Sequence, residues 1–95
     1  MNKLSNKVAV ITGATSRIGL AAARRFAAEG ARVVLFARTE ETVLQAQRSI
    51  GGDAIGVHGD VSDATALTRL FEEARRIHGR VDVLLSLPEY APPHA

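Results

Sequence analysis

The 95-residue sequence contains no cysteine, and lysine occurs only twice, as Lys3 and Lys7. The lack of cysteine excludes disulfides, thiolate metal ligands and a cysteine nucleophile, and it suits the reducing cytoplasm, where we expect the protein. No apolar run approaches the roughly 20 residues that span a bilayer, so no membrane segment is expected. The first apolar run, residues 8–11, is also too short for the apolar region of a signal peptide.

A strong charge imbalance is missing as well, because the net charge is only +2. Most basic residues are arginines scattered among glutamates on predicted helices, and no basic stripe alternates with aromatic residues. We therefore expect no nucleic-acid partner.

The histidines His58, His78 and His94 have no partners at metal-ligand spacing, so no metal site is predicted. A partly charged imidazole is expected for His78, near the end of a helix.

Two apolar patterns alternate along the chain. A short apolar run at 8–11 and segments rich in apolar residues at 32–37, 54–58 and 81–85 predict strands, of which 54–58 is the weakest. Helical spacing predicts a helix over about 17–29, with Ile18 on its buried face, and two more that end at Gly51 and Gly79. The expected caps of these two helices are Thr39 and either Ser62 or Asp63.

This βαβαβαβ order predicts an α/β fold, with three helices packed on a parallel sheet of four strands. Right-handed crossovers give the strand order 3-2-1-4, which is part of a Rossmann fold. We expect residues 1–87 to form this truncated N-terminal, NAD(P)-binding subdomain. Residues 88–95 hold all three prolines and no periodicity, so they are predicted to be a disordered tail.

The turn between the first strand and the first helix carries the candidate chemistry. It reads Thr12-Gly13-Ala14-Thr15-Ser16-Arg17-Ile18-Gly19. In a βαβ unit this turn holds the pyrophosphate of a dinucleotide, because glycines allow close approach and the helix N-terminus supplies N–H groups. Thr15 and Ser16 can add hydroxyl donors. The alternative interpretation is a plain strand-to-helix turn with a serine cap.

The turn resembles the Thr-Gly-x-x-x-Gly-x-Gly motif of the short-chain dehydrogenase/reductase family. Thr12, Gly13, Ile18 and Gly19 fall on the motif, whereas Arg17 replaces its middle glycine and can swing over a phosphate as a cation. Asp60-Val61 resembles the family's Asp-[Val/Leu] pair, in which the carboxylate accepts a hydrogen bond from the adenine amino group. Residues 78–84 resemble the run before the family's Asn-Asn-Ala-Gly. The resemblance covers residues 5 to about 85.

The resemblance implies a dinucleotide-binding part of an oxidoreductase that transfers hydride between an alcohol or carbonyl and NAD(P). NAD-preferring members usually end the second strand with an acidic residue, but here Ala37 takes that place and Arg38 follows. A guanidinium suits a 2′-phosphate, so NADP is expected rather than NAD, and a solvated arginine is the alternative. The expected cofactor-binding residues are Gly13, Thr15, Ser16, Arg17, Ile18, Gly19, Arg38, Asp60 and Val61.

The catalytic Tyr-x-x-x-Lys of the family has no counterpart, because the only lysines stand at the start of the chain. Tyr90 has His94 at the fourth position, and residues 86–89 replace Asn-Asn-Ala-Gly. We therefore predict no catalytic residue and expect this chain to be inactive as an enzyme. The alternatives are a stand-alone nucleotide-binding or interaction module and a fragment without function.

The abrupt end of the resemblance after Leu85 predicts a change of reading frame. Codons for residues 87–90, read from the third base of the Leu87 codon, can spell Ala-Gly-Ile, the continuation expected in the family. A gene that ends here is the alternative, and the nucleotide sequence distinguishes the two.

The fourth strand is expected to be an open apolar edge, which predicts an aggregation-prone chain of undetermined oligomeric state.

Overall fold

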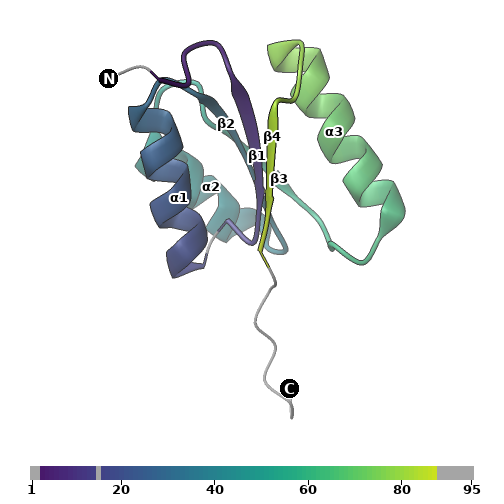
Figure 1. Ribbon diagram of the computed structural model, residues 1–95. Coiled ribbons are helices and arrows are strands. Elements are labelled where there is room, and N and C mark those ends of the chain that lie inside the picture. Colours follow the sequence, from purple (N-terminus) through teal and green to yellow (C-terminus); the bar gives the residue numbers. More distant parts are fainter. Residues whose placement is uncertain (1–2, 15, 88–95) are drawn as a thin grey trace.

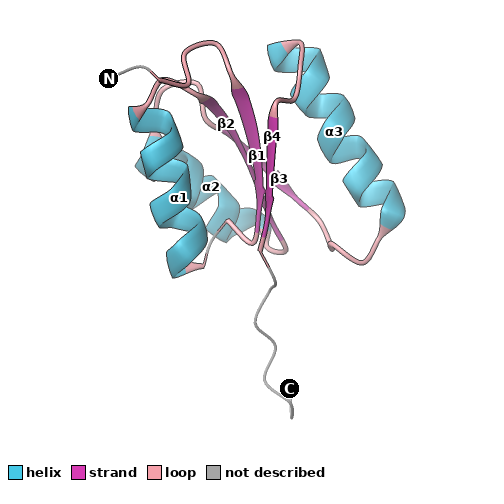
Figure 2. Ribbon diagram, in the orientation of Figure 1, coloured by secondary structure: helices cyan, strands magenta, loops and turns pink. Residues whose placement is uncertain are grey.

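The computed structural model describes residues 3–14 and 16–87. The predicted alternation of strands and helices is confirmed (Figure 2). The elements are β1 (Val8–Thr12), α1 (Arg17–Ala28), β2 (Arg32–Ala37), α2 (Glu40–Ile50), β3 (Ile55–His58), α3 (Ala64–His78) and β4 (Val83–Ser86). Thr15 and the predicted tail, residues 88–95, lie outside the described residues.

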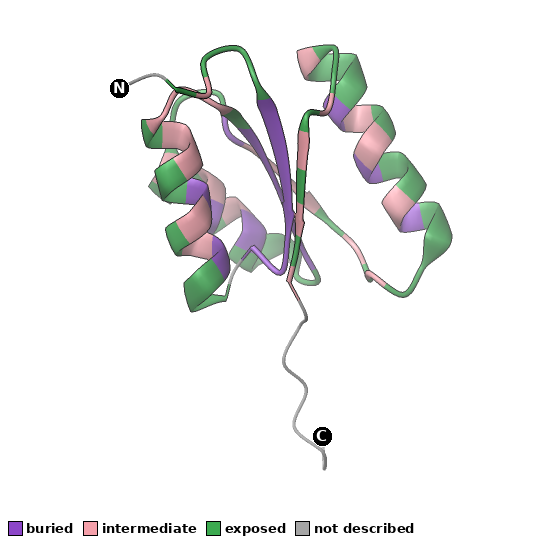
Figure 3. Ribbon diagram, in the orientation of Figure 1, coloured by how far each residue is buried: buried purple, intermediate pink, exposed green. Residues whose placement is uncertain are grey.

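All neighbouring strands run parallel, and their order, β3-β2-β1-β4, is the predicted one. Helices α1 and α2 cover one face of the sheet and α3 covers the other (Figure 1). Alternate residues of the strands therefore face different helices: Ile11 and Leu35 pack with α1 and α2, whereas Val10 and Phe36 pack with α3. This three-layer arrangement explains the continuous apolar runs of β1 and β2, which are buried nearly throughout (Figure 3).

One of the two expected caps of α3 is confirmed, whereas the capping bond of α2 and the first turn of α1 differ from the predictions. Thr39 stands at the N-cap of α2 but its side chain makes no capping bond; the Thr42 hydroxyl donates to its carbonyl instead. Asp63, and not Ser62, caps α3, because its Oδ1 accepts from the Thr65 N–H at 2.9 Å. Ile18 is 69% exposed rather than buried, since no described element covers the first turn of α1.

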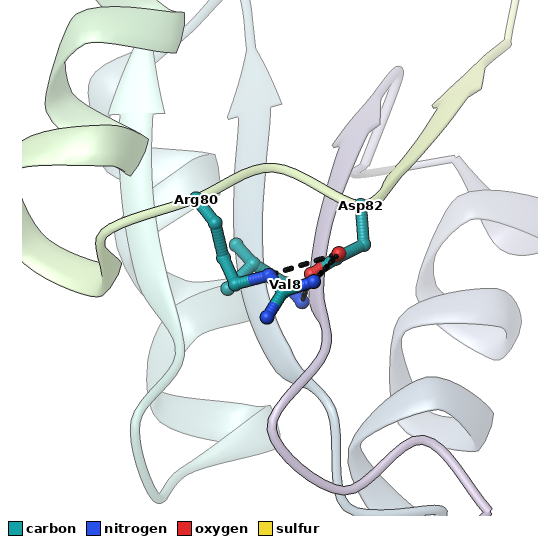
Figure 4. Close-up of polar contacts among 3 residues, drawn as sticks. All are labelled: Val8, Arg80 and Asp82. Atoms are coloured by element: carbon teal, nitrogen blue, oxygen red, sulfur yellow. Dashed lines mark hydrogen bonds and ion pairs between the residues drawn. The ribbon is translucent and has the colours of Figure 1, made fainter.

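Strand β4 begins at Val83, two residues later than predicted, and ends at Ser86. The shift arises at Asp82, whose N–H donates to the Val8 carbonyl while its Oδ2 accepts from the Val8 N–H at 2.9 Å (Figure 4). The Arg80 guanidinium donates twice to the other carboxylate oxygen of Asp82. The hydrogen bond from the Val8 N–H lowers the pKa of Asp82 the most, and the hydrogen bond from Arg80 lowers it further. A side chain thus takes over a contact that a regular strand makes with its backbone.

His78 was expected to carry a partial charge, but its surroundings favour the neutral ring. Its Nε2 is buried and has no hydrogen-bond partner within residues 3–14 and 16–87. Burial lowers the pKa of His78, and the charge of Arg32 lowers it further, against the opposing effect of Asp53.

Across residues 3–14 and 16–87, no helix has the length and apolar character needed to cross a membrane.

Candidate functional site

The site begins where β1 ends, at Thr12 and Gly13. Gly13 has a φ of +66°, and a Cβ at this position would lie 2.9 Å from the carbonyl oxygen of Leu87. The Thr12 hydroxyl is buried beside it, accepting from the Leu87 N–H at 3.2 Å and donating to the Ser86 hydroxyl at 3.3 Å. Glycine is therefore required here both for the backbone conformation and for contact with the end of β4.

Ser16 closes the turn and starts α1. Its Oγ accepts from the Gly19 N–H at 2.9 Å and donates to the Gly13 carbonyl at 2.8 Å. The Ser16 N–H donates to the same carbonyl. The hydroxyl donor that the sequence offered for a phosphate is thus engaged within the turn. Thr15, the other expected hydroxyl donor, lies outside the described residues.

Gly19 is held by its neighbours inside the protein. A Cβ there would lie 2.3 Å from the Gly13 carbonyl oxygen and 2.9 Å from the Ala14 Cα, and neither backbone atom can rotate away. The last glycine of the motif therefore allows the first turn of α1 to pack against the turn before it, a role that does not require a ligand.

The N-terminus of α1 is open and electropositive. The N–H groups of Arg17 and Ile18 have no hydrogen-bond partner among the described residues, as expected for the first positions of a helix. No acidic side chain occurs in the first turn, and Arg17 adds an exposed cation there. Open N–H groups, the positive end of the helix dipole and a guanidinium together favour an anion at this end of the sheet.

A second group of predicted residues follows β2 and β3. These strands are neighbours, and the Gly59 N–H donates to the Ala37 carbonyl at 2.9 Å, so Arg38 and Asp60 stand at adjoining strand ends. The hydrogen bond from the Ser62 N–H lowers the pKa of Asp60 the most, and the bond from the Ser62 hydroxyl lowers it further. The positive charge of Arg38 adds a smaller effect in the same direction. Asp60 is therefore an ionised acceptor near a guanidinium. Val61 is half-buried and packs under α3.

Sequence reasoning missed three contributors to this region: Ser62, Ser86 and Leu87. The signal for Ser62 was available, because a serine two residues after an aspartate is typical of a turn closed by the carboxylate. No local signal existed for the contact of Leu87 with Thr12, which joins residues 75 positions apart. Among residues 3–14 and 16–87, no group of three or more histidine and acidic side chains could hold a metal ion.

A parallel sheet of order 3-2-1-4, with a glycine turn between its first strand and first helix, defines the N-terminal half of a Rossmann-type fold. The comparison with known families agrees with this class. The profile of the family described as short chain dehydrogenase matches residues 7–86, and the chain belongs to this family.

Several relatives are similar over nearly the whole chain. The meso-2,3-butanediol dehydrogenase of Serratia marcescens is 48% identical over 85 residues, which are 88% of this chain and 34% of that protein. The bovine (Bos taurus) dehydrogenase/reductase SDR family member 4 is 39% identical over 94 residues, or 96% of this chain and 34% of the relative. This chain therefore spans about a third of the length of these relatives.

A solved structure resembles the fold closely. The 3-ketoacyl-(acyl-carrier-protein) reductase from Brucella melitensis, crystallised with NADH, superposes with a TM-score of 0.83 at 38% sequence identity. The match covers 86% of this chain and 34% of the reductase chain. The similarity is thus confined to one part of a longer protein.

Proposed function

We propose that residues 1–87 form the part of an NADP(H) site that binds the adenosine and the pyrophosphate. The observation that carries this proposal is the open N-terminus of α1, where the unpartnered N–H groups of Arg17 and Ile18 stand beside the Arg17 guanidinium. The NADH complex of the Brucella reductase supports a nicotinamide dinucleotide as the ligand. The donor set fits such a ligand, because it offers N–H groups and a cation with no carboxylate in the first turn of α1.

Each end of the ligand has its own residues. Arg17 and Ile18 bind the pyrophosphate, in a turn shaped by Gly13, Ser16 and Gly19. Asp60 accepts a hydrogen bond from the adenine amino group, and Val61 lies beside it. Arg38 binds the 2′-phosphate, and we propose NADP(H) over NAD(H) because no carboxylate ends β2 to repel that phosphate.

The proposed role of this chain is binding, without turnover. When bound, the nicotinamide supplies a hydride for carbonyl reduction or accepts one from an alcohol, as we propose for full-length relatives. The sequence has no Tyr-x-x-x-Lys to donate the proton, so purified chain mixed with NADPH and a ketone should not oxidise the NADPH. The same absence favours a second candidate, a non-catalytic nucleotide-binding module. Because cysteine is absent, we place either function in the cytoplasm.

Calorimetry with 2′-phospho-AMP and AMP tests the proposal. The wild type should bind 2′-phospho-AMP roughly tenfold more tightly than AMP, as expected for one added charge-assisted contact. Arg38→Ala should bind both ligands equally. The matched control is Arg48→Ala, which removes an exposed arginine at the far end of α2 and should keep the wild-type preference. Equal affinity of the wild type for both nucleotides would exclude the NADP assignment.

A further inference from the structure

The Asp60 carboxylate is held by one neighbouring residue. The Ser62 N–H donates to Asp60 Oδ1 at 2.9 Å, and the Ser62 hydroxyl donates to the same oxygen at 2.8 Å. The Asp63 N–H also donates to the Asp60 carbonyl, at 2.9 Å. Both the backbone and the carboxylate of Asp60 are thus fixed within a turn of four residues, and Ser62 engages only one of the two carboxylate oxygens.

The turn itself is pressed against the protein core at Gly59. An ideal Cβ at Gly59 would lie 2.9 Å from the Cζ of Phe36 and 3.0 Å from the Cβ of Ala66. Phe36 is completely buried, so it cannot move aside. The Gly59 N–H donates to the Ala37 carbonyl at 2.9 Å, which ties the same turn to the end of β2. The position of Asp60 is therefore set by the sheet and its orientation by Ser62.

We propose that Ser62 is a positioning residue of the adenosine site, which occupies Asp60 Oδ1 and directs Oδ2 toward the amino group of a 6-aminopurine. The inference rests on the proposed function. A carboxylate oxygen accepts hydrogen bonds and cannot donate them, so Oδ2 pairs with the amino group of adenine and repels the carbonyl of a 6-oxopurine. Loss of the Ser62 hydroxyl leaves the Ser62 N–H as the single bond from this residue to Oδ1, so the carboxylate is held less firmly, which weakens both the contact and the discrimination.

Affinities for AMP and IMP, measured by calorimetry, test this role. The wild type should prefer AMP over IMP. Ser62→Ala should bind AMP about threefold to tenfold more weakly, the usual effect of one hydrogen bond, and should lose most of the preference. Ser62→Thr keeps the hydroxyl and should restore both. The matched control is Ser49→Ala, which loses a hydroxyl bonded to Arg24 at 2.9 Å on the exposed side of α1 and α2 and should behave as wild type.

The pH dependence of AMP binding separates positioning from a general loss of structure. The Ser62 N–H lowers the pKa of Asp60 the most, and the Ser62 hydroxyl lowers it further. Ser62→Ala removes only the hydroxyl's part, which raises the pKa of Asp60, so AMP binding should weaken at a higher pH than in the wild type as acid is added. A Ser62→Ala protein with wild-type AMP affinity and AMP-to-IMP preference overturns the inference, as does a wild type that binds AMP and IMP equally. A wild type that binds no nucleotide overturns the inference and the proposed function together.

Discussion

Individual atoms determine the shape of the turn between β1 and α1. Its first glycine meets the Leu87 carbonyl, and its last meets the Gly13 carbonyl. The Ser16 hydroxyl joins these two glycines by one accepted and one donated hydrogen bond. Among the described residues of this turn, the Arg17 and Ile18 N–H groups have no partner within the protein. The proposed specificity for an anion therefore depends on two backbone groups and one guanidinium.

Gly19→Ala should destabilise the protein, although alanine favours helices. Overpacking against fixed backbone atoms costs about 1–3 kcal/mol, and the gain in helix propensity returns up to about 1 kcal/mol. We expect the free energy of unfolding, measured with urea, to fall by about 1–2 kcal/mol. The reverse exchange at an exposed position of α1, Ala21→Gly, should cost about 1 kcal/mol from propensity alone. A Gly19→Ala protein at least as stable as the wild type would contradict the packing argument.

At the scale of the elements, the bounds of a strand were predicted well where the local apolar pattern was clear. Strand β2 was predicted with its observed bounds, because its apolar residues 33–37 lie between Arg32 and Arg38 and are buried on both faces. Strand β4 was placed two residues early, because the Asp82 side chain takes the place of a backbone partner. In the candidate site, the turn was predicted from the glycines between a strand and a helix, and Asp60 from the resemblance to the family. The contact between Thr12 and Leu87 depends on the assembled sheet.

The C-terminal end of α3 should respond to mild acid through His78. Its pKa in the folded state is lowered from the ordinary value of 6.5, so the unfolded chain binds the proton more readily. The contribution of His78 to the free energy of unfolding is therefore fully present above about pH 6.5. It falls as the pH decreases through that value toward the folded-state pKa. Urea unfolding between pH 7.5 and pH 5, the range that we take to span this ordinary histidine pKa, should show this loss.

The replacement His78→Gln removes the titrating group and should flatten the pH dependence in that range. The control, His58→Gln, makes the same exchange at an imidazole that is about half exposed and 4.0 Å from Glu40. The carboxylates of Asp60, Asp82 and Glu73, whose pKa values are also lowered, act in a separate range, and their stabilisation is lost only at more acidic pH. An unchanged slope in His78→Gln would exclude His78 as its source.

On the scale of the whole molecule, the sheet is asymmetric. Strands β1 and β2 are central and buried, whereas β4 is an outer strand that is bonded to β1 on one side. Leu84 of this strand is 52% exposed, on the face that α3 covers only in part. An apolar, parallel outer strand that the helices among the described residues cover only in part is a surface on which other chains can add.

Leu84→Lys should reduce self-association of the 95-residue chain. A charge on an exposed strand opposes the approach of another chain. In sedimentation experiments the average mass of the wild type should rise with concentration, and that of Leu84→Lys should rise less. The control, Ile77→Lys, makes the same kind of change at an exposed position of α3 and should behave as wild type. A wild type that stays monomeric at every concentration would contradict this expectation.

The pairing of Val8 with Asp82 has a consequence for the order in which the chain assembles. The two residues are 74 positions apart, whereas the other neighbour of Val8, Arg32, is much closer along the chain. Each doubling of a closed loop adds about 0.6 kcal/mol of chain entropy, so β1 meets β2 more readily than it meets β4. We therefore expect β1 to pair with β2 before β4 joins the sheet, and we expect the Asp82 carboxylate to fix the register of β4 when it does.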